Sequence, residues 1–273
     1  AINMNANSNL TFNNSVFDDN STGGTDNSGG GLFFSEGNVT IINSIFKNNL
    51  ARGNGGAISG SGDGTLSITG SLFINNKATN INKTDGNGDK ANGGAITIFG
   101  DGRKVIMSKN TFYNNEATFQ GGGLYFGGLN ATSSLENITV FGNNVILNSA
   151  EETGGIRIEG NRNFEIKNSL FYDNHLEDNI KPQSDINIAS GVKLNFINSL
   201  SGVSSGFGLD DTYGSSKIDA VLASSNIRFN ETSGKVEYDE APNGDDTPID
   251  FGSDGNDAGA WSSMFVLSLK ESD

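Results

Sequence analysis

The sequence predicts an all-β protein, a single-stranded right-handed parallel β-helix in which each coil of the chain stacks on the coil before it. Three observations predict this solenoid. Two short motifs recur at intervals of 29, 27, 39, 29 and 30 residues, and periods of 20–50 residues are typical of repeat architectures. Strand-like alternation lies between the motifs. Glycine is abundant, with 38 residues, and proline is rare, with 3, which suits a chain of many turns and short strands.

The first motif is Phe-x-x-Asn, as in the stretch FYNNEATFQGGGLYF that begins at Phe112. Equivalent side chains of stacked coils lie directly above one another, about 4.8 Å apart. We therefore expect an aromatic ladder and an amide ladder, both facing inward, because an amide can donate to one neighbouring coil and accept from the other. The predicted ladders contain Phe17, Phe46, Phe73, Phe112, Phe141, Phe171 and Asn20, Asn49, Asn76, Asn115, Asn144, Asn174.

The second motif is Gly-(Gly/Ala)-aliphatic, which predicts a sharp corner followed by a strand whose first residue is buried. A degenerate last copy has Ser184 and Asp185 in place of the glycines. The predicted aliphatic ladder contains Leu32, Ile58, Ile96, Leu124, Ile156 and Ile186.

Short alternating stretches such as VTIINSIF, LSITGSLF and FEIKNSLF lie between the motifs. Alternation of apolar and polar residues over four to eight positions is typical of a strand. No segment has a sustained helical stripe, which excludes helical repeats. Propeller blades are usually longer, near 40–45 residues, so the unit of two or three short strands fits a β-helix coil better.

The predicted coils occupy residues 1–202, with an insertion loop at about 77–90 where the motif interval is longest. Residues 203–273 are predicted to form the last coils and an acidic C-terminal cap, since they hold 14 acidic and 4 basic residues. The chain starts at Ala1 within a repeat. We expect either an upstream segment or a partner's strand to complete that edge by β-augmentation.

These repeats resemble the polymorphic outer membrane proteins of chlamydiae, whose passenger domains repeat Gly-Gly-Ala-(Ile/Leu/Val) and Phe-x-x-Asn. The resemblance covers about residues 10–200, where NNLARGNGGAI and NNEATFQGGGLYF follow the pattern. It implies a secreted, surface-displayed passenger with a role in adhesion. A second stretch, Asp245–Trp261, resembles the closing segment of many bacterial right-handed β-helix proteins.

The charge and composition exclude several function classes. A formal net charge of −15 argues against binding nucleic acid, whose phosphates require basic patches. No apolar run has the length of a transmembrane helix. Without cysteine the chain has neither disulfides nor thiolate metal sites.

One stretch suggests a metal site. Asp85, Asn87 and Asp89 place oxygen ligands at alternate positions, as the opening of a calcium loop does. Lys90 follows where an EF-hand has glycine, and no glutamate follows at the twelfth position. Calcium is therefore the one cofactor that the sequence suggests, held in an exposed loop rather than in an EF-hand.

The sequence predicts a bacterial extracellular or cell-surface module with a structural or adhesive function. Its partner would be a cell surface, a glycan, or copies of itself joined head to tail in a fibre. The alternative is a polysaccharide lyase or glycosidase acting on an acidic glycan. Such a lyase needs a basic residue near a uronate, and Arg157 is the arginine that the pattern places in a strand.

Overall fold

A computed structural model of the chain describes most of the repeat region and a short hairpin beyond it. The described residues are 1–4, 8–23, 27–79, 91–129, 131–146, 153–160, 163–176, 185–189, 192–197, 199–201, 204–205, 227–230 and 235–238. Within them the fold is an all-β parallel β-solenoid with no helix, as the sequence predicts.

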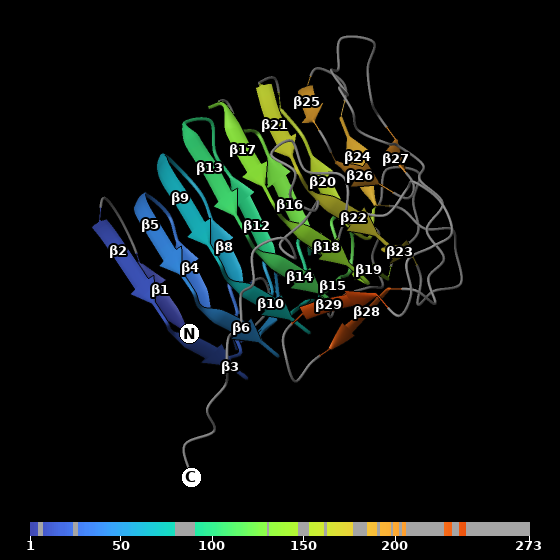
Figure 1. Ribbon diagram of the computed structural model, residues 1–273. Helices are drawn as coiled ribbons and strands as arrows, with labels where there is room; N and C mark the ends of the chain where they lie inside the picture. Colours follow the sequence, from blue (N-terminus) through green and yellow to red (C-terminus); the bar gives the residue numbers. More distant parts are fainter. Residues whose placement is uncertain are drawn as a thin grey trace, which may run out of the picture.

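Each coil passes through up to four strands, which pair in parallel with the equivalent strands of neighbouring coils to form four sheets (Figure 1). Sheet A contains β1 (Ile2–Met4), β4 (Leu32–Phe34), β8 (Ile58–Gly60), β12 (Ile96–Phe99), β16 (Leu124–Gly127), β20 (Ile156–Ile158), β24 (Ile186–Ile188) and β27 (Ser204–Ser205). Sheet B contains β2 (Ser8–Asn13), β5 (Gly37–Ile42), β9 (Gly64–Thr69), β13 (Arg103–Ser108), β17 (Ser133–Glu136), β21 (Asn163–Lys167) and β25 (Lys193–Ile197).

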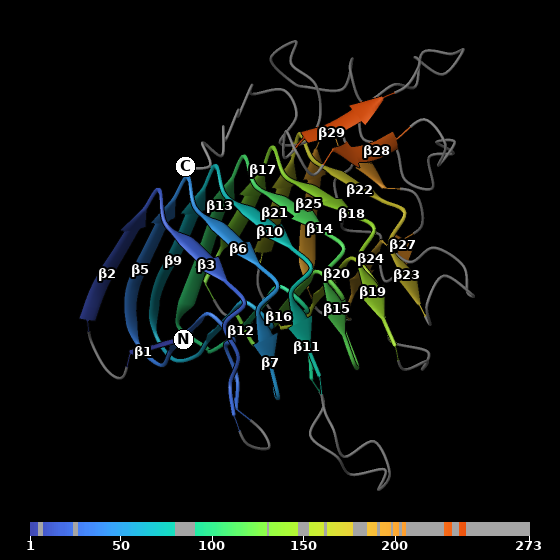
Figure 2. The ribbon, with the colours of Figure 1, turned by 90° about the horizontal axis from the view of Figure 1, so that it is seen from below.

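The other two sheets lie side by side in Figure 2. Sheet C contains β3 (Val16–Asp18), β6 (Ile45–Lys47), β10 (Leu72–Ile74), β14 (Thr111–Tyr113), β18 (Thr139–Phe141), β22 (Leu170–Tyr172) and β26 (Leu200–Ser201). Sheet D contains β7 (Leu50–Ala51), β11 (Lys77–Ala78), β15 (Glu116–Ala117), β19 (Asn144–Val145) and β23 (His175–Leu176). Sequence alternation does not reveal sheet D, because its strands are two residues long. A separate antiparallel hairpin joins β28 (Ile227–Asn230) to β29 (Lys235–Tyr238).

The core is a stack of like side chains. The rings of Phe17, Phe46, Phe73 and Phe112 lie nearly parallel, with successive centroids 4.3, 5.0 and 4.8 Å apart. The aliphatic residues that open the strands of sheet A pair in register from Leu32 to Ile186 and are fully buried. Burying each such side chain stabilises the fold by about 1.5–3 kcal/mol, and only neighbouring coils can bury it.

The predicted ladders need one correction, because the fifth coil is one residue out of register with the motif. Val140, not Phe141, pairs with Phe112 on one side and Phe171 on the other. Phe141 instead follows Tyr113 in the outward column. The motif failed here because Phe141 and Asn144 match Phe-x-x-Asn one residue after the residues that occupy the ladders, Val140 and Asn143.

The corner after sheet C explains the residue that precedes each ladder amide. Asn48, Asn75, Asn114 and Asp173 have φ between 51° and 56°, and Gly142 has φ of 62°. Asparagine, aspartate and glycine tolerate this left-handed region better than other residues. A left-handed residue followed by asparagine is therefore the stronger motif, and it identifies Asn143 rather than Asn144 as the ladder residue of the fifth coil.

The insertion leaves the stack intact. Phe73 and Phe112 pair although 39 residues separate them. Lys77 and Ala78 belong to β11, so the insertion starts later than the predicted residue 77. Residues 80–90 and most of the predicted cap lie outside the described residues.

Candidate interaction site at the first coil

A buried amide ladder runs along the solenoid beneath the corner between sheets C and D. The side-chain amide of Asn76 donates 2.9 Å hydrogen bonds to Asn115 Oδ1 and to the carbonyl oxygen of Phe46, and its backbone N–H also donates to Asn115 Oδ1. Each amide thus joins three coils. The ladder runs through Asn20, Asn49, Asn76, Asn115, Asn143 and Asn174.

The two ends of this ladder differ because the hydrogen bonds have a direction. Within the ladder, each asparagine donates to the Oδ1 of the next asparagine and accepts at its own Oδ1 from the asparagine before it. At the far end Asn174 donates to the buried Oδ1 of Asp185 at 2.6 Å. At the near end Asn20 Oδ1 accepts a 3.3 Å hydrogen bond from the amino group of Ala1. A strand that continued the ladder below Asn20 would have to bring N–H donors.

The register of the fifth coil can be tested with two neighbouring asparagines. We expect Asn143→Ala to lower the free energy of unfolding by about 3 kcal/mol or more, since each buried partner left unpaired costs about 1–3 kcal/mol. Asn143 Oδ1 accepts from both the backbone and side chain of Asn115. Asn144→Ala is the matched control, with an expected loss below about 1 kcal/mol. Denaturant unfolding measures both, and equal losses would contradict the corrected register.

A second ladder, which the sequence interpretation missed, lines the corner between sheets B and C. Ser44 Oγ accepts from the backbone N–H of Ser15, Ser71 Oγ accepts from Ser44 N–H, and Asn110 Oδ1 accepts from Ser71 N–H. The signal is a left-handed residue such as Asn43 followed by serine. It recurs in the stretches INSIF and KNSLF.

The first coil presents the edges of three sheets. β1, β2 and β3 are the terminal strands of sheets A, B and C. Two large apolar side chains are exposed there, Ile2 at 39% and Val16 at 57%. In the second coil Ile45, which pairs with Val16, is only 3% exposed. Unpaired edge strands with apolar side chains are templates for pairing with another chain.

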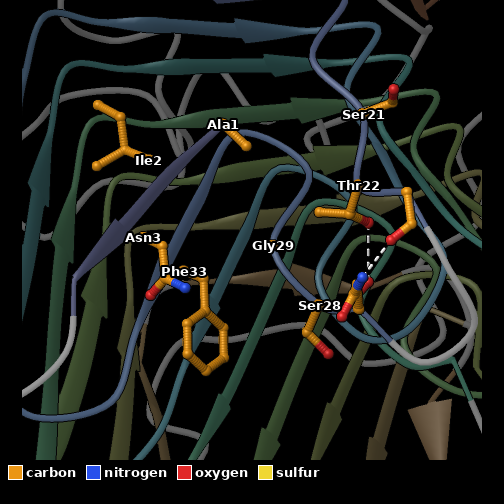
Figure 3. A pocket seen from close by; sticks show the side chains of 10 residues that line it. Ala1, Ile2, Asn3, Ser21, Thr22, Ser28, Gly29 and Phe33 are labelled. Carbon is orange, nitrogen blue, oxygen red and sulfur yellow. Dashed lines mark hydrogen bonds between the residues drawn. The ribbon is translucent and has the colours of Figure 1, made fainter.

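A half-open hollow of about 420 Å³ lies beside this edge (Figure 3). Ala1 and Asn3, a residue of β1, form one side, and the segments that carry Thr22 and Ser28 form another. The hydroxyl of Thr22 is fixed by donating to the carbonyl oxygen of Asn27 at 2.9 Å. The lining of the hollow combines hydroxyl and amide groups and the amino group of Ala1 with the side chain of Ile2 and the partly exposed ring of Phe33.

The outer face of sheet A holds a small polar network around Glu159. Arg157 Nε lies 2.9 Å from Glu159 Oε1, and Tyr125 Oη donates to Glu159 Oε2 at 2.9 Å. The guanidinium also donates to Asn187 Oδ1. Burial, and then Glu159, raises the pKa of Tyr125 well above its usual value. The carboxylate of Glu159 compensates the positive charge of Arg157. The lyase alternative would need that positive charge for binding a uronate.

The predicted calcium ligands Asp85, Asn87 and Asp89 lie outside the described residues. The described part of the chain contains no cluster of three or more histidine, cysteine or acidic residues able to hold a metal ion. No helix in that part is long and apolar enough to cross a membrane.

Tyr172 gives a pH prediction. Burial, followed by the carboxylates of Asp173 and Asp185, raises the pKa of Tyr172 to about 12, whereas an unfolded tyrosine titrates near about 10. The neutral phenol therefore stabilises the folded state fully below about pH 10, and this contribution is lost as the pH rises toward about 12. In denaturant titrations across that interval the wild type should lose more stability than Tyr172→Phe. Parallel losses would contradict the assignment.

The fold defines the chain as a parallel β-solenoid. No family model matches the sequence, and neither the curated proteins nor the solved structures contain a match.

Proposed function

We propose that this chain is a structural or adhesive module of a bacterial cell surface, which binds through the exposed edge of its first coil. Its partner is a further copy of the chain, a host or neighbouring surface, or a glycan. The observation that carries the proposal is the set of three edge strands with Ile2 and Val16 exposed. Such an edge offers backbone hydrogen bonds and apolar contacts to an incoming strand.

Two further features support this proposal. The repeat resembles that of the chlamydial polymorphic outer membrane passengers, for which the resemblance implies surface display and adhesion. The amide ladder also offers an acceptor, Asn20 Oδ1, at the same edge. The end of another copy, joined head to tail, is a heterologous contact that does not close, and such contacts build filaments.

The test compares the full chain with a variant carrying Ile2→Lys and Val16→Lys, because lysine on an edge strand opposes pairing. The control is Thr40→Lys, on the outer face of an inner coil of sheet B. Size-exclusion chromatography with light scattering, negative-stain microscopy, and binding to glycan arrays and cells measure the outcome. We expect assembly or binding by the wild type and the control, and its loss in the edge variant.

Two results would contradict the proposal. One is a chain that stays monomeric at high concentration and binds no glycan or cell. The other is cleavage of uronate polymers that disappears in Arg157→Ala, which would establish the polysaccharide lyase alternative instead.

A further inference from the structure

The outer face of sheet C is largely apolar. In each strand the ladder residue faces the core, and the residues on either side of it face outward. These outward residues form a stripe across five strands, which we call the outer stripe. Its apolar residues are Ile45, Leu72, Ile74, Tyr113, Phe141, Leu170 and Tyr172, and the remaining outward positions of these strands hold Lys47, Thr111 and Thr139.

The burial of this stripe exceeds what stacking within the sheet provides. Leu72 is 7% exposed, Phe141 5% and Leu170 1%, and of the apolar residues of the stripe Tyr113 alone is half-buried. On the outer face of sheet B, Ile42 and Ile106 also lie between stacked neighbours, yet both remain only half-buried. Ile45, Leu72 and Ile74 pack together as a hydrophobic cluster separate from the core. The difference between the two sheets indicates that another segment covers the outer stripe.

The hairpin β28–β29 has the pattern that such a cover requires. Its register pairs Ile227 with Tyr238 and Phe229 with Val236. The alternate register positions pair Arg228 with Glu237 and Asn230 with Lys235. Since directly opposed residues of an antiparallel pair share a face, one face of the hairpin carries four apolar residues and the other carries four polar ones.

The hairpin also lies in the right region. The hairpin is drawn outside the solenoid in both views, below β14 and β15 in Figure 1 and above β22 and β18 in Figure 2. A two-stranded hairpin alone is at best marginally stable in water and needs a packing partner. The largely apolar outer face of sheet C can satisfy that need.

We propose that the hairpin β28–β29 docks through its apolar face on the outer stripe of sheet C, near β18 and β22. The docked hairpin protects the stripe from water and ties the acidic C-terminal region to the body of the solenoid. This contact is separate from the edge of the first coil, because it buries a sheet face and uses no unpaired strand.

Hydroxyl-radical footprinting of the full chain, read by mass spectrometry, tests the proposal. Phe229→Asp with Val236→Asp places two charges on the apolar face of the hairpin. The control, Arg228→Asp with Lys235→Asp, makes the same number of changes on the polar face. We expect oxidation of Phe141 to rise several-fold in the first variant and to stay at the wild-type level in the second. Unchanged or equal oxidation in both variants would overturn the proposal.

Core oxidation at the fully buried Phe112 reports whether the solenoid itself has unfolded. If Phe112 is oxidised too, footprinting no longer reports on the hairpin alone, and crosslinking of two introduced cysteines tests the docking instead. The chain has no cysteine of its own that would interfere. A short bismaleimide should link Phe141→Cys to Val236→Cys within one chain. It should not link Ile106→Cys to Val236→Cys. Absence of the first link, or equal yields from both pairs, would overturn the docking.

Discussion

Replacing Arg103 with methionine is expected to lower the free energy of unfolding by about 3–5 kcal/mol, because it leaves several carbonyl oxygens unpaired and each buried one costs about 1–3 kcal/mol. Arg103 is the first residue of β13, and its side chain is fully buried. Its Nη2 donates 2.7 Å hydrogen bonds to the carbonyl oxygens of Ser61 and Asp63. Nε and Nη1 donate to the carbonyl oxygens of Gly62 and Gly37 at 3.0 and 2.8 Å.

These four hydrogen bonds tie three successive coils together at the corner between sheets A and B. The guanidinium carbon also lies 4.8 Å from the ring centroid of Phe34, within range of a cation–π contact. Methionine fills similar volume but leaves four carbonyl oxygens without these donors.

The matched control is Lys104→Met, on the next residue of the same strand, whose side chain is exposed. It should change stability by less than about 0.5 kcal/mol. Arg103→Lys should recover only part of the loss, because one ammonium lacks the forked geometry of the guanidinium. Equal denaturation midpoints for Arg103→Met and Lys104→Met would show that Arg103 does not hold the coils together.

Replacing Gly94 with alanine is expected to have the other large effect, more than about 3 kcal/mol, the upper range of typical overpacking. A Cβ at this position would lie 2.0 Å from the carbonyl oxygen of Gly122 and 2.4 Å from the backbone nitrogen of Glu116. Gly122 precedes the first strand of the next coil, and Glu116 lies in the last strand of the coil that Gly94 opens. Both are backbone atoms, so no side-chain rotation relieves the overlap. The coils would have to separate at this corner.

Gly23→Ala is the control for this substitution, since a Cβ there has no neighbour within 4 Å. We expect it to be neutral or slightly stabilising, by up to about 1 kcal/mol, because alanine restricts the unfolded chain. Thermal unfolding followed by far-UV circular dichroism compares the two. A Gly94→Ala protein as stable as Gly23→Ala would rule out the close approach of the coils.

The solenoid could be predicted from the sequence because the same residue types recur at equivalent positions of successive coils. Phenylalanine, asparagine and glycine recur at the same positions, and each has a separate physical reason to be there. A fold that repeats can be recognised even when one copy is degenerate, as at Asp185. There the glycine is lost, and the carboxylate accepts the last hydrogen bonds of the amide ladder.

Other features could not be predicted, because they depend on a register of one residue or on contacts across coils. In the fifth coil Phe141 matches the motif, although the neighbouring Val140 occupies the ladder position. The register of this coil therefore could not be read from the motif. Arg103 resembles a surface residue by composition, and the sequence interpretation placed only Arg157 in a strand. The inward alternation of Arg103 with Val105 and Met107 was the available signal.

The candidate site was partly foreseen. The sequence left two expectations for the edge of the first coil, an upstream segment of the chain or a strand of a partner. It did not indicate the hollow beside that edge, since the hollow forms where segments that carry Thr22 and Ser28 approach the first strand. Nor did it reveal the apolar outer stripe, which becomes visible only once the register of sheet C is known.

Disulfide formation between introduced cysteines tests the stacking of coils most directly, since the native chain has none. Thr40 and Ser67 are neighbours on the outer face of sheet B, and Ser67 in turn neighbours Ile106. Adjacent strands lie about 4.8 Å apart, within the Cα separation that a disulfide allows. We expect Thr40→Cys with Ser67→Cys to form an intramolecular disulfide under mild oxidation. Thr40→Cys with Ile106→Cys, which skips a coil, should stay reduced. Oxidation of the second pair in preference to the first would contradict the stacked solenoid.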